Sequence, residues 1–331
     1  MNLALFESEI LGVWLVLLSI HIEKIMYICR SLRTKSNQYY LFMSLKIVVL
    51  AKQVPDTRNV GKDAMKADGT VNRGALPAIF NPEDLNALEM ALTIKDKVPG
   101  TEVIILTMGP SRAAEIIRES IYRGADSGYL ITDRKFAGSD TLATSYAISM
   151  AVKKANPDIV IAGRQAIDGD TAQVGPQVAE KLNWPQITYA EEVISVNSST
   201  IVIKRRLERG VETVECKTPV LITVHSSAPE CRARNASRMM TFKHARTATE
   251  LQEEVRDYTE LYNQRPYLEL EEWNVETINA DTTHLGLSGS PTKVKKIDNV
   301  VLQQKDSMVL TDSNKDVELL MVNLISSHVV G

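Results

Sequence analysis

The segment from Gly163 to Val174 has the residue types best suited to binding a phosphate or a nucleotide. It follows a predicted strand and leads into a helix predicted over 171–182, and a helix N-terminus offers free amides and a partial positive charge to a phosphate. Gly169 allows close approach of the backbone, while Thr171 and Gln173 offer side-chain hydrogen bonds. The candidate binding residues are Gly163, Arg164, Gln165, Ala166, Ile167, Asp168, Gly169, Asp170, Thr171, Ala172, Gln173 and Val174.

The charged residues of this segment leave two interpretations open. Arg164 adds a fixed positive charge. Asp168 and Asp170 would repel a phosphate if they faced it, so we expect them to cap the helix or to bind ribose hydroxyls. The same residues fit an ordinary strand–loop–helix corner with an Asp cap equally well. The chain lacks the GxGxxG, GxxxxGKS/T and SGGxDS patterns, which argues against a standard dehydrogenase, a P-loop ATPase and an adenylating synthetase.

Short apolar runs alternate with amphipathic segments in the part of the chain that precedes Tyr189. The runs are rich in β-branched residues and predict strands that are buried on both faces. They cover 46–51, 102–108, 128–132 and 158–163. Helices between them are predicted to begin at Asn81, Ser111 and Ser139. This alternation predicts an α/β fold, with an open parallel sheet and flanking helices on both faces.

The helix expected after residue 80 has a well-marked start. Asn81 would cap the helix through a side-chain acceptor, and Pro82 suits the first helical position. Glu83 and Asp84 place negative charge in the first turn, where it opposes the helix dipole.

The pattern changes after Tyr189, where four strands are predicted to form an antiparallel addition to the sheet or a β arm. They cover 192–197, 200–206, 211–215 and 219–224. Farther on, we expect a helix near 248–261, an extended and poorly packed stretch over 263–298, and a final amphipathic helix over 316–327.

The sequence pattern of residues 1–42 differs from that of the rest of the chain. The rest is expected to divide into a nucleotide-binding α/β domain over 43–240 and an extended C-terminal region over 241–331. The apolar run Ile10–Ile22 is short for a membrane span, which needs about 20 residues, and the acids before it are unlike a signal peptide. Met43 followed by a buried strand is typical of a native start. We therefore expect 1–42 to be non-native upstream sequence, with a membrane-surface anchor as the alternative.

Composition restricts the partners. A net charge of -3 over 331 residues gives no broad basic field, so nucleic acid is not an expected partner. Three cysteines without CxxC spacing, and five histidines without HExxH spacing, argue against a disulfide scaffold and a metal site. Sparse cysteines fit a reducing compartment, and we expect a cytoplasmic protein without an integral membrane span.

Five stretches in this order resemble the β subunit of electron-transfer flavoproteins. They are Leu50–Asp56, Ile79–Glu89, Gly109–Pro110 with Ile121–Asp126, Gly163–Gly175 and Ile203–Thr223. The resemblance implies an adenine nucleotide α-hydrolase-like fold that binds an adenine nucleotide between the ends of its strands. The matching positions outside the segment that ends at Val174 are Ala51, Asn81, Pro82, Glu83, Asp84 and Met108.

The resemblance leaves the identity of this nucleotide open. In the mitochondrial type it is a structural AMP, and in flavin-bifurcating relatives it is a second FAD that can accept hydride from NADH. The stretches 54–57, 71–77 and 133–141 resemble the bifurcating type, in which Arg134, Asp140 and Thr141 would flank a flavin. A non-bifurcating bacterial relative would share the same stretches.

The family's α subunit carries the redox FAD and docks with acyl-CoA dehydrogenases of fatty acid β-oxidation. The resemblance therefore implies one half of a heterodimer that carries electrons and is not a stand-alone enzyme; we expect no catalytic acid, base or nucleophile. The β arm and the helix over 316–327 are candidates for wrapping the α subunit, although that helix could equally pack on its own domain.

A recognition loop of the family inserts a Leu into the partner dehydrogenase. The matching loop here is Glu230–Met240, and Ala236 occupies the anchor position. An Ala there would lose about 2 kcal/mol of anchoring. Arg232 makes the loop more basic, and Met239 is a possible substitute anchor.

Two other classes of function fit the sequence less well. A nucleotide-binding regulatory module of the universal-stress-protein type shares the α/β pattern, but its glycine-rich motif is absent and residues 189–331 would be unexplained. A dehydrogenase acting alone lacks both GxGxxG and a catalytic His or Tyr–Lys pair.

Overall fold

The computed structural model describes residues 44–56, 77–197, 199–253, 257–292, 309–327 and 329–330. The expectations for 1–42 and for a start at Met43 lie outside the described residues. The chain divides into two units, a body that holds all the described strands and a C-terminal unit that contains the last described helix. Among the described residues, none of the helices combines the length and apolarity that crossing a membrane requires.

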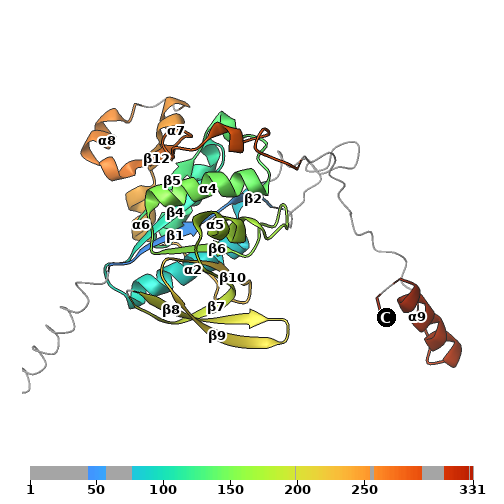
Figure 1. Ribbon diagram of the computed structural model, residues 1–331. Helices are drawn as coiled ribbons and strands as arrows, with labels where there is room; N and C mark the ends of the chain where they lie inside the picture. The colour runs from blue at the N-terminus through green and yellow to red at the C-terminus, as the bar shows by residue number, and fades with distance from the viewer. Residues whose placement is uncertain are drawn as a thin grey trace, which may run out of the picture. The chain divides into compact units, whose positions relative to one another are not determined.

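A ten-stranded sheet forms the centre of the body (Figure 1). Its order is β11-β12-β5-β4-β1-β6-β10-β7-β8-β9, and the strands run parallel from β11 to β7. The strands are β1 (Lys46–Leu50), β4 (Glu102–Met108), β5 (Ser127–Ile131), β6 (Ile159–Gly163), β7 (Gln186–Val196), β8 (Thr200–Leu207), β9 (Gly210–Lys217), β10 (Val220–Val224), β11 (Arg246–Thr247) and β12 (Glu269–Trp273).

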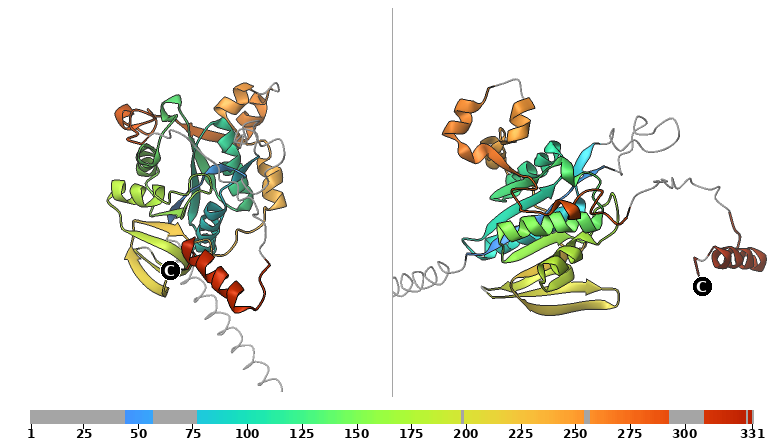
Figure 2. Two further views of the ribbon diagram at one scale, coloured as in Figure 1. Left: turned by 90° about the vertical axis from the view of Figure 1, so that its right-hand side faces the viewer. Right: turned by 45° about the horizontal axis from the view of Figure 1, so that its top comes forward.

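Helices cover both faces of the sheet, as the alternating pattern predicts. Ile47 and Val49 of β1 pack with α2 (Pro82–Lys97) and α3 (Ala114–Arg123) on one face. Val48 and Leu50 pack on the other face, with α4 (Thr141–Ala155) and α5 (Val174–Leu182), and Figure 2 shows this layering from two further sides. The alternation along β1 explains why a strand buried on both faces reads as a continuous apolar run.

The predicted antiparallel addition is correct for β8 and β9 and wrong for β10. β7, β8 and β9 pair antiparallel, and they form the arm at the bottom of Figure 1. β10 instead lies between β6 and β7 and is parallel to both. All five of its residues are buried, which suits the interior of a parallel sheet.

Two helix starts also differ from the prediction. The helix expected from residue 171 begins at Val174, because Asp170 and Ala172 have φ values of 48° and 52°, outside the helical region. The helix expected from Ser139 begins at Thr141, with Asp140 as its N-cap. The helix expected from Ser111 begins there with a 3-10 turn, which leads into α3.

The region after residue 240 is better packed than predicted. The prediction of an extended stretch over 263–298 is wrong for its described part, because β12 pairs with β5 and Trp273, Val275, Ile278 and Leu285 are buried. The helix expected near 248–261 is found as two short helices. The remaining body elements are β2 (Gln53–Pro55), β3 (Ala78–Phe80), α6 (Ala236–Phe242), α7 (Ala248–Glu253) and α8 (Thr259–Gln264).

The predicted C-terminal helix is present as α9 (Asn314–Ser326). The Ser313 side chain caps it by accepting a hydrogen bond from the Asp316 amide. Apolar side chains of α9 are exposed, among them Val317, Val322 and Ile325.

Candidate functional site

The candidate site lies at the carboxyl ends of β1 and β6, which are neighbours in the sheet. After β1 the chain continues through β4 and β5 on one side of it, and then crosses to β6 on the other side. Ligands of open α/β sheets bind where the strand order reverses in this way. Ala51 follows β1, and Met108 and Gly163 end β4 and β6, so the fold brings these three predicted positions to one edge.

Asn81 contacts the loop that follows β6 and does not cap its own helix. Its amide nitrogen donates to the Gln165 carbonyl at 2.9 Å, and its oxygen accepts from the Ile167 amide at 3.2 Å. The predicted side-chain cap is therefore wrong, since both polar atoms are already used. Pro82 occupies the first turn as predicted.

Glu83 binds the same loop through both carboxylate oxygens. It accepts from the Arg164 guanidinium at 3.0 Å and from the Gln165 amide at 3.0 Å. The hydrogen bond that the guanidinium donates to Glu83 is the main cause that raises the pKa of Arg164. The sequence suggested that Arg164 adds a positive charge to the loop. In the structure, an ion pair with Glu83 balances that charge.

Asp84 joins the ends of the two strands. Its carboxylate accepts from the Lys52 amide after β1 at 2.8 Å and from the Gly163 amide at the end of β6 at 3.1 Å. Burial raises the pKa of the Asp84 carboxyl to about 7, although hydrogen bonds from Asn81, Lys52 and Gly163 lower it. Gly163 has no room for a side chain, because a Cβ would lie 2.3 Å from the Asp84 Oδ1 atom.

The second half of the loop is more open. Asp168 pairs with the Lys52 ammonium at 2.8 Å, and Asp170 accepts from the Gln165 side chain at 3.1 Å. A Cβ on Gly169 would meet no atom within 4 Å. Neither Asp caps α5, whose N-cap is Gln173 without a side-chain capping bond. This weighs against the ordinary Asp-capped corner. Among the described residues, the first amides of α5 have no side-chain capping partner.

The start of α4 meets the loop through Thr141, whose hydroxyl donates to the Gln173 side chain at 2.9 Å. Asp140 is occupied elsewhere, because it caps α4 and accepts from the Thr292 hydroxyl at 2.6 Å. Burial would raise its pKa, but the hydrogen bonds from Thr292, Ala143 and Leu142 together lower it. Arg134 is exposed in a 3-10 turn over Arg134–Phe136. Sequence reasoning missed Thr292, which lies 152 residues from Asp140.

The predicted recognition loop is tied to the body by its arginines. Arg232 forms ion pairs with Glu89 and Asp96, and Arg238 donates to main-chain carbonyls at the end of α3. Ala236 is the exposed first residue of α6.

The exposed large apolar residues of α6 are the two methionines. Met239 is 36% exposed and Met240 is 66% exposed. Met240, which the sequence did not single out, is thus the more accessible apolar side chain.

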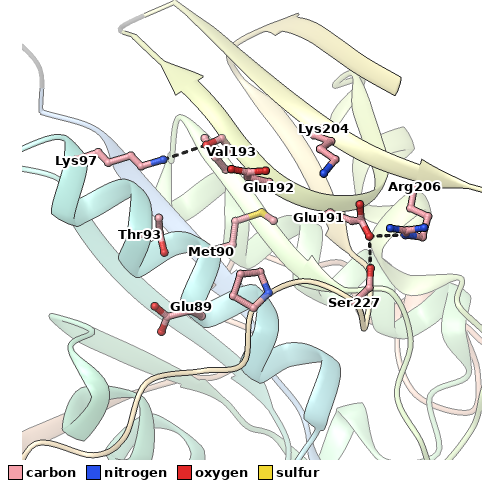
Figure 3. Close-up of a pocket in the computed structure, with 11 residues that line it drawn as sticks. Glu89, Met90, Thr93, Lys97, Glu191, Glu192, Val193, Lys204, Arg206 and Ser227 are labelled. Carbon is pink, nitrogen blue, oxygen red and sulfur yellow. Dashed lines mark hydrogen bonds and ion pairs between the residues drawn. The ribbon is translucent and has the colours of Figure 1, made fainter. Parts of the chain in front are cut away.

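A separate cavity of about 410 Å³ lies along the second half of α2, between Met90 and the arm strands (Figure 3). One acid and one base of its lining pair with each other, since Arg206 donates to Glu191, which also accepts from the Ser227 hydroxyl. Hydrogen bonds from Arg206 and Ser227 lower the pKa of Glu191. None of the predicted nucleotide-binding residues lines this cavity, so it is distinct from the loop after β6.

Comparison with known proteins shows the family of the chain. The electron transfer flavoprotein domain family matches residues 68–249. Over 252 residues, the chain is 45% identical to the electron transfer flavoprotein subunit beta of Clostridium acetobutylicum, covering 76% of this chain and 87% of that protein.

Two other relatives carry names of reductase complexes. This chain is 43% identical over 293 residues to the acryloyl-CoA reductase electron transfer subunit gamma of Anaerotignum propionicum. The match covers 86% of this chain and 100% of that protein. This chain is also 41% identical over 251 residues to the caffeyl-CoA reductase-Etf complex subunit CarD of Acetobacterium woodii, and the match covers 76% of this chain and 86% of that protein. The chain belongs to the electron transfer flavoprotein β-subunit family.

Proposed function

We propose that this chain is the β subunit of a heterodimeric electron-transfer flavoprotein and that the loop over 163–174 binds an adenine nucleotide. The observation that carries this proposal is the position of the loop, at the switch point of the sheet and leading into an uncapped helix. The family match also spans the arm, which the regulatory-module alternative left unexplained.

The loop can bind a nucleotide phosphate although its own positively charged side chains are already paired. Arg164 is paired with Glu83 and Lys52 with Asp168, so their charges are already balanced within the protein. Amides at the start of α5, the Thr171 hydroxyl and the open space at Gly169 remain to bind a phosphate. The subunit would hold and orient the nucleotide, and a flavin, where present, would supply the electron-transfer chemistry.

The nucleotide is AMP or the AMP half of a second FAD. The relatives named as parts of acryloyl-CoA and caffeyl-CoA reductase complexes favour the second FAD, the type in which NADH would supply hydride. Thr141 is the predicted flavin-side residue that already contacts the loop. Asp140 supports this region through the cap of α4 and its bond to Thr292.

The partners follow from the same proposal. The α subunit would bind α9 and the arm, because the apolar side chains of α9 are exposed within its own unit. An acyl-CoA or related dehydrogenase would dock at α6, with Met240 as the apolar anchor in place of the missing Leu at Ala236. The assembly would work in the cytoplasm.

Co-expression with the α subunit encoded in the same organism tests the proposal. Acid extraction and chromatography of the purified heterodimer would count the FAD and AMP molecules bound to it. Two FAD support the bifurcating type, and one FAD with one AMP supports a simple carrier. A chain that stays monomeric and holds no adenine nucleotide contradicts both.

A further inference from the structure

The start of α2 and the residue before it bind the end of β6 and the loop that follows through three buried side chains. Asp84 accepts from the Gly163 amide, and Glu83 accepts from the Gln165 amide. Asn81 donates to the Gln165 carbonyl and accepts from the Ile167 amide. The three side chains therefore fix four backbone groups within five consecutive residues.

These side chains have no free polar atoms for a ligand. Asn81 is 0% exposed, and Glu83 and Asp84 are each 7% exposed. Both carboxylate oxygens of Glu83 accept hydrogen bonds, and so do both oxygens of Asp84. A carboxylate facing a phosphate would repel it, whereas a carboxylate that accepts main-chain amides holds the main chain in place.

We propose that Asn81, Glu83 and Asp84 are positioning residues, which set the shape of the nucleotide-binding loop and do not contact the nucleotide through their side chains. This inference rests on the proposed function, because it assumes that the loop binds the nucleotide. The second half of the loop and the start of α5 would contact the nucleotide, and α2 would hold the loop in position. Lys52 extends the support, since its amide binds Asp84 and its ammonium binds Asp168.

Glu83 and Glu89 of the same helix form a matched pair for the test. Glu83 accepts a hydrogen bond from the Gln165 amide and forms an ion pair with Arg164. Glu89 accepts from the main-chain amide of Arg232 and forms an ion pair with the guanidinium of the same residue. Their side chains are similarly exposed, at 10% and 14%. Only Glu83 touches the loop, so the pair separates loop positioning from a general effect on α2.

The experiment measures the Kd of added AMP for the nucleotide-depleted heterodimer, in the wild type and in the variants Glu83→Ala, Glu83→Gln and Glu89→Ala. AMP serves as the probe because it is common to both candidate nucleotides. We expect Glu83→Ala to weaken AMP binding by roughly tenfold or more, the effect of a lost hydrogen bond to a charged group. Glu83→Gln still offers an oxygen to the Gln165 amide and should stay within about threefold of wild type.

The control, Glu89→Ala, should leave AMP binding unchanged even if it lowers the stability of the fold. To keep the freed guanidinium from acting on the phosphate, both Glu83 variants are repeated in an Arg164→Gln background. If both Glu83 variants bind AMP more tightly than Arg164→Gln alone, the Glu83 carboxylate faces the ligand and repels it. That result would overturn the inference. Equal weakening by Glu83→Ala and Glu89→Ala would also overturn it. If wild type binds no AMP, the proposed function itself fails.

Discussion

The Asp84 carboxylate accepts a hydrogen bond from the Gly163 amide at 3.1 Å and so joins the first turn of α2 to the end of β6. The same carboxylate accepts from the Lys52 amide at the end of β1. One side chain thus connects the two strands that frame the candidate nucleotide site. Its position explains why β6 ends in a glycine, since α2 approaches too closely for any Cβ.

Gly163→Ala should destabilise the fold by about 1–3 kcal/mol, the usual cost of overpacking. A Cβ there would lie 2.3 Å from the Asp84 Oδ1 atom and 2.8 Å from the Asp84 amide nitrogen, so α2 must shift. Urea unfolding measures the change.

Gly169→Ala is the matched control in the same loop. Its Cβ would meet no atom, so the free energy of unfolding should change by less than about 0.5 kcal/mol. AMP binding should nevertheless weaken, because the new methyl group occupies the open space beside the bound nucleotide. Equal stability of the two variants would contradict the close approach of α2.

Asp84→Asn should change how stability depends on pH. The pKa of Asp84 in the folded state, about 7, lies above its ordinary value of 3.8, so the folded protein binds this proton more tightly than the unfolded chain. The resulting stabilisation is complete below about pH 4 and is lost as the pH rises to about 7. It amounts to something on the order of 4 kcal/mol.

The measurement is urea unfolding of wild type and Asp84→Asn at several pH values between 4 and 8. The variant cannot titrate at this position, so wild type should lose stability relative to it as the pH rises to 7, and the difference should then stay constant. Parallel curves across the whole range would show that the carboxyl does not titrate in this window.

A double variant tests which half of the loop binds the nucleotide. Asp170→Asn with Thr171→Ala should lower the bound nucleotide and make the heterodimer dissociate more readily, while leaving the fold of the body intact. Both residues are exposed, and Asn tolerates the φ of 48° found at position 170. Nucleotide retained after gel filtration gives the result.

The matched control changes another exposed Asp–Thr pair, as Asp281→Asn with Thr282→Ala. It should leave the nucleotide content at the wild-type level. If the loop variant also retains a full complement of nucleotide, the ligand lies elsewhere on the chain.

Met240→Ala should slow electron transfer with the partner dehydrogenase without changing stability. Burying a Met side chain contributes about 1.5–3 kcal/mol, so the apparent affinity for the dehydrogenase should fall roughly tenfold. Ala236→Leu should act in the opposite direction by adding an apolar anchor. The readout is the dependence of the transfer rate on dehydrogenase concentration.

Leu287→Ala is a suitable control, because Leu287 is 63% exposed and lies outside α6. An effect of Leu287→Ala equal to that of Met240→Ala would mean that α6 has no special role in docking.

Local patterns in the sequence predict the strands and helices of the body well. β4 has the bounds predicted for it, β1 and β6 differ by one residue at one end, and β5 is shifted by one residue. β-branched runs buried on both faces leave few alternatives. Pro82 fixes the start of α2 for a similarly local reason. The place of the loop at the sheet edge also follows, since parallel strands bring their carboxyl ends together.

Contacts between distant residues were beyond such patterns. An Asn before a Pro predicts a cap, yet Asn81 binds Gln165, which is 84 residues away. Nothing local to β12 shows that it joins the sheet between β11 and β5. Asp170 and Ala172 have left-handed backbone conformations, so α5 begins later than predicted. Their conformation depends on the path of the whole loop.

We infer that this chain holds an adenine nucleotide of its own at the loop after β6. The most direct measurement is the number of adenine nucleotides released by acid from the purified heterodimer, compared with the single FAD expected of the α subunit. We predict two per heterodimer, either two FAD or one FAD and one AMP. A release of one FAD alone, from a stable heterodimer, would contradict the claim.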